Sequence, residues 1–567
     1  MLHTIIKPAT YQDSVSLMVL STQLSGLDEV ERVSIMMGTP ANKGIFADTG
    51  FVSPQIEAAG PADLVIALES EDPEAPALIL SRVEEYIAQQ ASASRSASYP
   101  RVRSLERARS VLPQANLALV SIPGEQAAPE IERLLDADLH VFVFSDNIPV
   151  EDEVRLKTRA RERGLLMMGP DCGTGSLGGL PLAFTNIVTP GPIGIVGASG
   201  TGTQEVMVQI DLAGGGVSQA IGLGGRDLSE KVGAITCIQA LQALDADPAT
   251  RVITLVSKPP APSVRENVLG ICQQLSTPVV AILLGEEPAQ EQDGNVAFAR
   301  TLEDAARLAV ALAGPVREGD GEVPEADPAA PAPGQRTLRG LFCGGTLAAE
   351  SALMLSRALG VPPDAEHPAG FMLDHDGHRI IDLGDDAYTQ GRPHPMIDPS
   401  LRAEKVREAF DDPEVAVVLV DVVTGYGSHA DPAGALVPAI EEGRAAAAAA
   451  GREVVVVASV CGTELDPQPR SAQIAALEAA GAVVLDSNAA ATRHALAILR
   501  GLGESAVPAA VPAPTRALVS APPQVINVGL PSFAAALHER GGEVVQYTWS
   551  PLAGGNPRLQ KILAALT

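Results

Sequence analysis

The segment GPIGIVGASGTGTQEV at residues 191–206 combines the residue types of an anion-binding turn. A short apolar run ends in small residues, and a helix is predicted to begin near Thr201. The free backbone N–H groups of a first helical turn, together with the helix dipole, attract an anion. The alternative is an ordinary strand-to-helix turn that needs small residues for packing. The predicted phosphate-binding residues of this turn are Ser199, Gly200, Thr201 and Gly202.

A second glycine cluster, AIGLGGRDLSEK, follows at residues 220–231, again at a predicted loop that enters a helix. Because ligands of open α/β sheets bind at the carboxyl ends of the strands, we expect this loop to lie beside the first. Gly224 and Gly225 are predicted to bind phosphate, and Arg226 could hold a phosphate or carboxylate with two N–H groups. Arg226 and Asp227 are therefore candidate catalytic residues. The alternative for Arg226 is a surface salt bridge to Asp227 or another neighbour.

Cys172 lies in a third turn rich in Gly and Pro, MMGPDCGTGSLGG at residues 167–179. A cysteine in such a turn could contact a thioester or a thiol cofactor, so Cys172 is a third candidate catalytic residue. The alternative is a buried, unreactive thiol, which is the commoner state of an isolated cysteine.

The second half of the chain contains two further candidate segments. DVVTGYGSHADPAGAL (421–436) places Gly425 and Gly427 between a strand and a helix, and we predict that they bind phosphate opposite the Ser199 turn. GHRIIDLGDDAYTQGRPHPMIDPSLR (377–402) gathers acidic residues and histidines that could serve acid/base chemistry or bind a metal. These residues are Asp382, Asp385, Asp386 and His394. The alternative is a plain solvated turn, and we assign no metal site to them.

The composition excludes several classes of protein. Of the 567 residues, 46% are apolar and 19% are charged, which suits a globular α/β protein. Acidic residues (69) outnumber Lys and Arg (40), and the formal net charge of −29 repels nucleic acid. The five cysteines form no CxxC pair, and no apolar run approaches the roughly 20 residues that span a bilayer. We expect a cytoplasmic protein that binds neither nucleic acid nor membrane.

Short runs of Val, Ile and Leu alternate with helical stretches along both halves of the chain. Two examples are LALVSI (117–122) and VAVVLVDVV (415–423). Continuous apolar strands separated by helices are typical of parallel sheets covered on both faces. Segments rich in Pro at 314–335 and 506–523 are predicted to be linkers. The predicted fold class is therefore α/β, with several domains, and the second half repeats the rhythm of residues 190–312.

The loops, in this order, resemble those of the α subunit of succinyl-CoA synthetase. GPDCGT (169–174) stands where that family has a Gly-Pro-Asn-Cys turn, and residues 194–206 and 220–228 are similar to its phosphate-side loops. The second half resembles the carboxyl-terminal domain of the β subunit in IIDLGDD (380–386) and in REAFDDPEVAVVLVDVVTGYG (407–427). This resemblance implies a Rossmann-like CoA-binding-type domain and two flavodoxin-like ligase-type domains. CoA is the cofactor that it implies.

A narrower resemblance is to the FdrA proteins. The chain is identified as a member on the blocks KPATYQDSVSLM (7–18), MMGTPANK (36–43), GTLAAES (345–351) and GRPHPMIDP (391–399). Membership implies a subunit of an oxamate carbamoyltransferase of allantoin breakdown, acting on carbamoyl phosphate or a similar acyl phosphate. It also implies partner protein subunits and an oligomer. The tail at 526–557 resembles the start of a family encoded beside FdrA genes, and we interpret it as a docking module or as a small domain that caps the sheet.

These resemblances divide the chain into seven parts. They are 1–100, a small N-terminal α+β module; 101–189, the Rossmann-like CoA-binding-type domain; 190–313, a domain like the ligase domain of the α subunit; 314–336, a linker; 337–504, a domain like the carboxyl-terminal domain of the β subunit; 505–523, a linker; and 524–567, the C-terminal docking module.

Three elements of the synthetases are absent from their expected places. VVAILLG (279–285) is followed by EEPAQEQDGNVAFART (286–301), where the synthetases carry the phosphorylated histidine. There is no ATP-grasp domain and no Walker loop. The first Gly-rich strand and turn of the CoA domain are also missing, and the module of residues 1–90 takes their place. These departures favour transfer of a carbamoyl or acyl group to or from phosphate, which needs anion and oxyanion donors but no histidine. The alternatives are an acyl-CoA synthetase without its own phosphohistidine and a non-catalytic scaffold.

Overall fold

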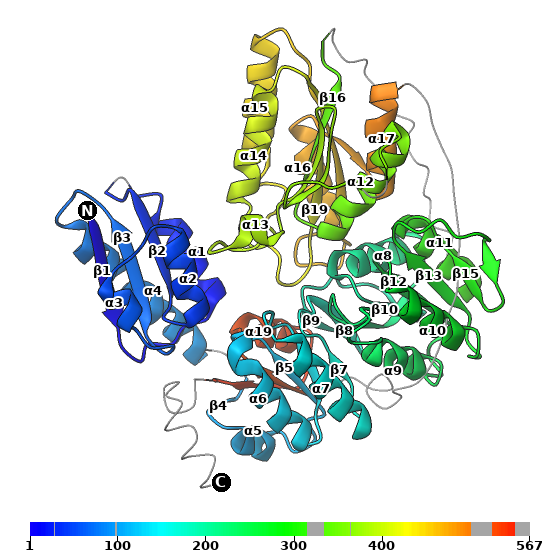
Figure 1. Cartoon of the computed structure of the whole chain (residues 1–567), viewed down its shortest axis with the longest axis horizontal. Helices are drawn as coiled ribbons and strands as arrows, with labels where there is room; N and C mark the ends of the chain where they lie inside the picture. Colours follow the sequence, from blue (N-terminus) through cyan, green and yellow to red (C-terminus); the bar gives the residue numbers. More distant parts are fainter. Residues whose placement is uncertain (28, 97–98, 315–333, 363–364, 501–523, 550–567) are drawn as a thin grey trace.

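The computed structural model describes residues 1–549 except 28, 97–98, 315–333, 363–364 and 501–523. Four β-sheets with helices packed against them make up this part of the chain (Figure 1). The predicted mixed α/β fold class, with several sheets rich in parallel strands, is confirmed. Most of the predicted linker 314–336 and all of the predicted linker 505–523 lie outside the described residues. None of the described helices combines the length and apolar character needed to cross a membrane.

The N-terminal module is a small antiparallel sheet covered by helices. Its elements are β1 (Leu2–Lys7), α1 (Ser14–Leu24), β2 (Arg32–Met37), α2 (Pro40–Asp48), α3 (Pro54–Ala58), β3 (Leu64–Glu69) and α4 (Ala75–Ser96). The strand order is β1-β3-β2, and both pairings are antiparallel. Apolar side chains of α1, α4 and the sheet form one core, and Phe46, Phe51 and Ile56 belong to a second core. Figure 1 shows the module at one side of the molecule, with α1 on its inner side.

The second sheet is built from two segments that lie far apart in the sequence. The first segment contributes β4 (Arg101–Val102), α5 (Leu105–Val111), β5 (Leu117–Val120), α6 (Gly124–Asp136), β6 (His140–Val143), α7 (Val150–Glu162) and β7 (Met167–Met168). The end of the chain contributes β22 (Val525–Val528), α19 (Pro531–Glu539) and β23 (Val544–Tyr547). The order is β4-β23-β22-β5-β6-β7, and every pairing is parallel.

This sheet corrects the prediction of a separate C-terminal docking module. In the described part of that segment, β22 lies between β23 and β5, and all residues of both strands are buried. The unit β22–α19–β23 therefore supplies the strand, turn and helix that are missing ahead of β5 in the sequence. The physical reason is that the inner strands of a parallel sheet are apolar and need a partner on each edge. Residues 550–567 of the predicted module lie outside the described residues.

The third sheet has eight strands in the order β14-β15-β13-β12-β10-β11-β8-β9. Its elements are β8 (Thr174–Leu177), β9 (Leu180–Ala183), β10 (Pro190–Gly197), α8 (Gly200–Leu212), β11 (Val217–Gly222), α9 (Ile235–Leu244), β12 (Val252–Ser257), α10 (Pro262–Cys272), β13 (Val279–Leu283), β14 (Gln292–Asp293), β15 (Val296–Phe298) and α11 (Leu302–Ala313). The strands β11, β10, β12, β13 and β15 run parallel. The strand β10 lies inside the sheet and leads directly into α8.

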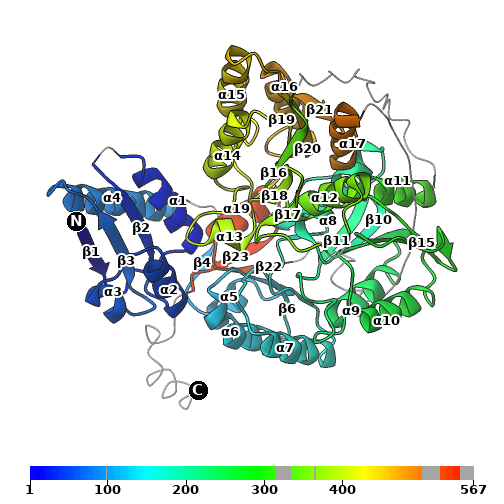
Figure 2. The same ribbon diagram turned by 45° about the horizontal axis from the view of Figure 1, so that its top comes forward.

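The fourth sheet repeats this plan in the second half of the chain. Its elements are β16 (Thr337–Phe342), α12 (Gly345–Leu359), β17 (Phe371–His375), β18 (His378–Asp382), α13 (Asp386–Thr389), α14 (Ser400–Asp411), β19 (Val415–Val423), α15 (Val437–Ala449), β20 (Val455–Cys461), α16 (Arg470–Ala479), β21 (Val483–Leu485) and α17 (Asn488–Arg500). The order is β17-β18-β16-β19-β20-β21, and β16 leads directly into α12. Figure 2 shows α8 and α12 close together where the two halves meet, and the contacts agree.

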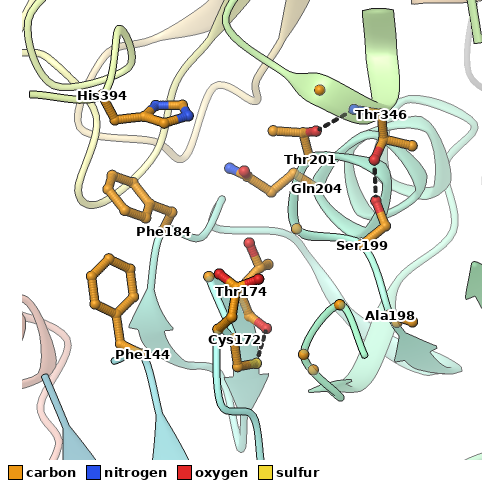
Figure 3. A pocket seen from close by; sticks show the side chains of 18 of the residues that line it. Phe144, Cys172, Thr174, Phe184, Ala198, Ser199, Thr201, Gln204, Thr346 and His394 are labelled. Carbon is orange, nitrogen blue, oxygen red and sulfur yellow. Dashed lines mark hydrogen bonds between the residues drawn. The ribbon is translucent and has the colours of Figure 1, made fainter. Parts of the chain in front are cut away.

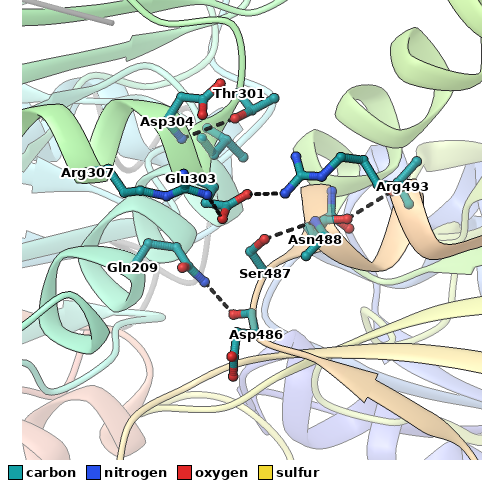
Figure 4. A network of polar contacts seen from close by, with 12 residues as sticks. Gln209, Thr301, Glu303, Asp304, Arg307, Asp486, Ser487, Asn488 and Arg493 are labelled. Atoms are coloured by element: carbon teal, nitrogen blue, oxygen red, sulfur yellow. Dashed lines mark hydrogen bonds and ion pairs between the residues drawn. The ribbon is translucent and has the colours of Figure 1, made fainter. Parts of the chain in front are cut away.

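A buried polar network also joins the two halves (Figure 4). The backbone N–H of Asn488 donates to Oε1 of Glu205 at 3.1 Å, and the side-chain amide of Asn488 donates to Oε2 of Glu350 at 2.8 Å. At the edge of the network, Arg493 pairs with Glu303 at 2.7 Å. Burial raises the pKa of both Glu205 and Glu350 to about 7. The packing between α8, α12 and α17 therefore favours the protonated form of both carboxyl groups below about pH 7.

Candidate functional site

A cavity of about 600 Å³ lies where the two halves of the chain meet (Figure 3). The turn before α8, the Cys172 turn and the loop after β11 line it from the first half. The start of α12 and residues 393–397 line it from the second half. Val15 and Met18 of α1 add an apolar contribution from the N-terminal module. Three of the turns predicted from sequence therefore converge on one space.

The turn between β10 and α8 has the geometry of a capped helix start. Ser199 is the N-cap, and its Oγ accepts a hydrogen bond from the N–H of Gly202 at 3.1 Å. Thr203 donates its hydroxyl to the carbonyl oxygen of Ser199 at 2.6 Å. The hydroxyl of Ser199 is the kind of N-cap group that satisfies one of the free N–H groups of the first turn. The helix α8 therefore begins at the wall of the cavity with its dipole directed at it.

A second helix begins at the same cavity from the other half of the chain. Gly344 is the N-cap of α12, and Asp421 accepts hydrogen bonds from the N–H groups of Cys343 at 2.9 Å and Gly344 at 2.8 Å. Arg402, which is itself buried, pairs with the carboxylate of Asp421 at 2.9 Å. This ion pair holds the turn between β16 and α12 in place.

The two helix starts touch each other. Oγ of Ser199 lies 2.5 Å from Oγ1 of Thr346, and the N–H of Thr346 points to Oγ1 of Thr201 at 3.4 Å. Figure 3 shows these three side chains on one side of the cavity. Lys258, which directly follows β12, also lines the cavity. Two helix N-termini and Lys258 therefore bring positive charge to a cavity that the carboxyl group of Asp171 also lines, in a chain of strongly negative net charge.

Five of the predicted phosphate-binding residues line this cavity, namely Ser199, Gly200, Thr201, Gly224 and Gly225. Gly202 lies behind them, where a Cβ atom would be 2.6 Å from Oγ of Ser199 and 2.9 Å from Cγ2 of Thr346. The structure thus brings the two N-terminal glycine clusters together, as expected from their places at the carboxyl ends of β10 and β11. Phosphate binding by these residues stays a prediction.

The predicted phosphate-binding role of Gly425 and Gly427 does not fit their position. Neither residue lines the cavity. Both have positive φ, and a Cβ atom would lie 2.5 Å from the carbonyl oxygen of Thr185 at Gly425 and 2.6 Å from the ring of Phe184 at Gly427. Tyr426, between them, forms an antiparallel bridge with Thr185. These glycines therefore allow the halves to approach closely, and the segment that faces the Ser199 turn is the start of α12.

The structure also gives Arg226 and Asp227 contacts that oppose the expected catalytic roles. Arg226 donates to Oε2 of Glu153 at 3.0 Å and to the carbonyl oxygen of Ile148 at 2.8 Å. Asp227 is fully buried, pairs with Lys157 at 2.6 Å and accepts the N–H of Cys237 at 2.8 Å. Neither residue lines the cavity. Their ion pairs and hydrogen bonds attach the loop after β11 to α7 and α9.

Cys172 does line the cavity, but its thiol is protonated. Its Sγ lies 3.6 Å from the carbonyl oxygen of Thr174, and burial raises the pKa of the thiol to about 12. A thiol with such a pKa is a poor nucleophile at neutral pH. The contacts therefore favour the alternative of a buried, unreactive cysteine.

The cavity also has lining residues that are not among the candidates from sequence, and three of them are Thr346, Asp171 and Gln204. Thr346 belongs to CGGTLAAES, which follows the strand TLRGLF in the same way as the Ser199 turn follows β10. That pattern could have identified it. Asp171 precedes Cys172 at positive φ, and burial and the nearby carboxylate of Asp146 raise its pKa to about 6. Gln204 lies one turn into α8, where sequence alone gives no signal that its side chain lines the cavity.

The acidic segment of the second half separates into structural and cavity-lining residues. Oδ1 of Asp382 accepts the N–H of Gly384 at 2.9 Å, and Asp385 caps α13. Burial raises the pKa of Asp382 to about 6. His394 lines the cavity, whereas Asp386 does not. In the part of the chain that the structure describes, no group of three or more His, Cys, Asp or Glu side chains is arranged to hold a metal ion.

Two family models match segments that form the third and fourth sheets. A model described as CoA-ligase matches residues 341–498, and one described as CoA binding domain matches residues 188–285. The second match falls on the third sheet, rather than on residues 101–189, where we predicted the CoA-binding-type domain. A third model, described as AllF, heavy metal-associated domain, matches residues 1–102. The fold and the domains are thus those of the succinyl-CoA ligase-like acyl-CoA synthetases.

One relative, an uncharacterized protein, matches most of the chain. Over 498 residues the chain is 43% identical to the uncharacterized protein YahF of Escherichia coli (strain K12). The matched residues make up 85% of this chain and 96% of YahF. The chain belongs to the same family as YahF, within the acyl-CoA synthetase superfamily.

More distant relatives match a smaller part of the chain. The α subunit 2 of an ADP-forming succinate–CoA ligase of Archaeoglobus fulgidus is 29% identical over 178 residues, which are 30% of this chain and 59% of that subunit. The chain thus spans about three fifths of that ligase subunit. Among solved structures, the apo form of a dinucleotide-forming acetyl-coenzyme A synthetase 1 of Ca. Korarchaeum cryptofilum is 17% identical. The match covers 68% of this chain and 82% of that chain, with a TM-score of 0.28.

The name of the N-terminal family model implies a heavy metal, but the residues of this segment do not fit one. Residues 1–102 contain no cysteine, and His3 is their one histidine. Soft metals are held by Cys thiolates, Met thioethers and His imidazoles, and this segment offers only scattered methionines besides His3. The N-terminal module instead contributes Val15 and Met18 to the wall of the cavity.

Proposed function

We propose that this cavity binds an acyl phosphate, carbamoyl phosphate among them, and that the protein transfers the acyl or carbamoyl group between phosphate and an acceptor. The observation that carries the proposal is the contact between Ser199 and Thr346, because it places two helix N-termini against one cavity. Each first turn offers free N–H groups and partial positive charge to an anion. Lys258 adds a full positive charge at the same wall.

The chemistry that this site supports is direct transfer. An acceptor nucleophile attacks the carbonyl carbon, the bond from that carbon to the bridging phosphate oxygen breaks, and phosphate leaves with both electrons of that bond. The helix N-termini stabilise the charge that develops on the leaving phosphate. No histidine follows β13, where residues 284–301 read LGEEPAQEQDGNVAFART. This sequence supports a transfer that does not pass through a phosphohistidine at that position.

A finer assignment follows from the resemblance to FdrA proteins. According to this resemblance, the chain is a subunit of an oxamate carbamoyltransferase that works with partner protein subunits in an oligomer. In that case the transferred group is carbamoyl, and the acceptor is oxamate or, in the other direction, phosphate. The fold, the net negative charge and the cavity are compatible with this assignment.

Ligand binding by the full chain tests the proposal. We expect isothermal titration to detect binding of carbamoyl phosphate, acetyl phosphate and inorganic phosphate. Replacing Thr201 and Thr346 together by Val removes two hydroxyls beside the helix starts, and we expect at least about a tenfold loss of affinity for all three ligands. Thr49→Val, at the exposed end of α2, is the matched control. A wild-type chain that binds none of the three ligands would refute the proposal.

A second candidate function is CoA-dependent acyl transfer, and the completed second sheet favours it. The turn between β22 and α19 ends at a second cavity of about 630 Å³, which Gly529, Pro531, Arg101 and Arg103 line. The two arginines and the N-terminus of α19 are groups that could hold the phosphates of CoA. Bound CoA would supply a thiol as acyl acceptor. Titration with CoA tests this candidate, and the double variant Arg101→Ala/Arg103→Ala should weaken binding at least about tenfold.

A further inference from the structure

We infer that Gln204 and His394 recognise the acyl part of the ligand, Gln204 by accepting a hydrogen bond from a ligand N–H and His394 by donating one to a ligand carbonyl oxygen. This inference rests on the proposed binding of an acyl phosphate in the same cavity. It adds two specificity-determining residues that lie on opposite halves of the chain, one in α8 and one between α13 and α14.

Gln204 carries a buried acceptor without a partner. The side chain is 0% exposed and lines the cavity. Its Nε2 donates to Oδ1 of Asn186 at 3.0 Å, whereas its Oε1 has no hydrogen-bond partner among the described residues. In Figure 3 the amide of Gln204 extends from α8 towards the side where Phe184 and His394 lie. Buried polar atoms nearly always have partners in folded proteins, so this oxygen indicates a place for a ligand donor.

The orientation of the Gln204 amide is fixed by its neighbours. The side-chain N–H groups of Asn186 donate to Oδ2 of Asp466 at 2.8 Å and to the carbonyl oxygen of Thr424 at 3.2 Å. Both partners accept, so the amide nitrogen of Asn186 must face them and its oxygen must face Gln204. Gln204 then has to turn its own nitrogen towards Asn186. The oxygen is thereby left on the other side as an acceptor.

His394 has the opposite polarity. The N–H of Met396 donates to Nδ1 of His394 at 3.2 Å, so Nδ1 is the acceptor nitrogen and the ring proton belongs to Nε2. Burial lowers the pKa of the imidazole to about 4, against the opposing effect of Asp421, and the ring is neutral near pH 7. Among the described residues Nε2 has no hydrogen-bond partner. Gly384 leaves room for it, because a Cβ atom there would lie 2.4 Å from Nε2.

An acceptor and a donor of fixed orientation in one cavity match a particular ligand chemistry. A carbonyl oxygen suits the Nε2–H of His394, and an N–H group on the same carbonyl carbon suits Oε1 of Gln204. A primary amide or carbamoyl group offers both, whereas an acetyl group offers a methyl group to Gln204 and leaves its oxygen unpaired. A site that hydrogen-bonds a ligand N–H discriminates strongly against an analogue that lacks it.

The test compares carbamoyl phosphate with acetyl phosphate by titration of the full chain. Gln204→Met keeps the length of the side chain and removes the acceptor. We expect it to weaken carbamoyl phosphate binding about tenfold while acetyl phosphate and inorganic phosphate bind as before. Gln204→Asn, which withdraws the oxygen by one methylene, should lower the ratio of the affinities for carbamoyl phosphate and acetyl phosphate in the same direction. This variant replaces Gln204→Met in the test if the Met variant does not fold. Gln89→Met, on the exposed face of α4, is the matched control.

His394 is tested by a separate pair of variants. His394→Phe removes the N–H, and we expect both carbamoyl phosphate and acetyl phosphate to bind about tenfold more weakly, with inorganic phosphate unchanged. His394→Gln retains an N–H donor and should recover most of the loss. If His394→Gln does not recover the lost affinity for the two acyl phosphates, His394 acts only through packing. The part of the inference that concerns His394 then fails.

The outcomes separate this inference from the proposed function. A wild-type chain that binds neither acyl phosphate overturns the proposed function, and the inference falls with it. A different result is that the wild-type chain binds both acyl phosphates while Gln204→Met and Gln204→Asn leave the ratio of the two affinities unchanged. That result overturns the role of Gln204 alone. The proposed binding of acyl phosphates would then stand.

Discussion

Oγ of Ser199 lies 2.5 Å from Oγ1 of Thr346, although 147 positions separate the two residues in the sequence. Each hydroxyl stands at the start of a helix, α8 in the first half and α12 in the second. The contact therefore aligns two helix N-termini that the chain builds independently. It also makes the cavity dependent on the correct packing of both halves, since neither helix alone provides more than one wall.

Gly202 should be sensitive to the smallest enlargement. A Cβ atom at this position would lie 2.6 Å from Oγ of Ser199 and 2.9 Å from Cγ2 of Thr346, so Gly202→Ala has to move one helix start away from the other. We expect the free energy of unfolding to fall by about 1–3 kcal/mol and carbamoyl phosphate to bind more weakly. Thermal unfolding and titration measure the two effects.

Gly270 provides the matched control for this substitution. It lies within α10, and a Cβ atom there would have no neighbour within 4 Å. We expect Gly270→Ala to raise the free energy of unfolding by about 0.5–1 kcal/mol, because Ala has the better helix propensity. A Gly202→Ala variant that matched it in stability and ligand binding would contradict the geometry described for the helix contact.

Removal of residues 524–567 should unfold the second sheet rather than release a partner-binding module. Without β22 and β23, strand β5 loses one of its two parallel partners and exposes an unpaired edge. We expect hydrogen exchange of the β5 amides to become fast and the truncated chain to aggregate. A peptide of residues 524–567 added in trans should restore slow exchange. Unchanged protection of β5 in the truncated chain would favour a separate docking module instead.

Two buried glutamates should make stability fall as the pH rises. The folded-state pKa of Glu205 and of Glu350 is about 7, above the ordinary value of 4.5 for a glutamate, because burial disfavours the charged form. The folded state thus retains protons that the unfolded state releases between about pH 4.5 and 7. The free energy of unfolding should decrease across this window by on the order of 3 kcal/mol for each group at most.

Amide replacements test this pH dependence. Glu205→Gln and Glu350→Gln cannot ionise, so chemical denaturation at pH 5, 6, 7 and 8 should show a flatter profile for each variant than for the wild type. Glu441→Gln, at an exposed position of α15, should leave the profile unchanged. A wild-type profile with no fall between pH 5 and 7 would show that these carboxyl groups are not held neutral.

Arg226 and Lys157 should affect stability rather than ligand binding. Arg226 is 42% exposed and pairs with Glu153, so Arg226→Ala should cost no more than about 1 kcal/mol. Lys157 is 0% exposed between Glu153 and Asp227. Lys157→Met leaves the buried carboxylate of Asp227 without a cation and Glu153 with Arg226 alone, at a cost of about 3–5 kcal/mol.

Chemical denaturation measures both changes, and titration with carbamoyl phosphate distinguishes them from a binding role. The affinity of the folded Arg226→Ala protein should equal that of the wild type. If the variant instead lost binding while it kept its fold, Arg226 would be the ligand clamp that its place after Gly225 first suggested.

The local pattern of the sequence was sufficient to predict much of the first half of the site. Apolar runs followed by small residues identified the strands β10 and β11 and the turns at Ser199 and Gly224, because strand ends and helix starts depend on neighbouring residues. The same pattern at Gly344 marks the start of α12. Gly425 and Gly427 are equally conspicuous in the sequence, but in the structure they allow close packing against Thr185 and Phe184.

The direction of individual side chains could not be predicted in this way. Arg226 and Asp227 have residue types suited to catalysis, yet buried partners on α7 bind both of them. Gln204 is an ordinary helix residue in sequence, and its unpaired oxygen results from contacts with Asn186, which lies in another part of the chain. Such contacts depend on residues that no local pattern relates.

The sequence by itself determined the α/β class, the repeated strand–helix plan of the two halves and the absence of a histidine after β13, because these depend on periodicity and residue identity. Only the tertiary structure decided that the end of the chain completes the second sheet, and that α8 and α12 begin at one cavity. Parallel strands pair across any distance in sequence, provided that both faces and both edges are covered. The pairing of β22 with β5 and the contact of Ser199 with Thr346 are therefore properties of the folded chain.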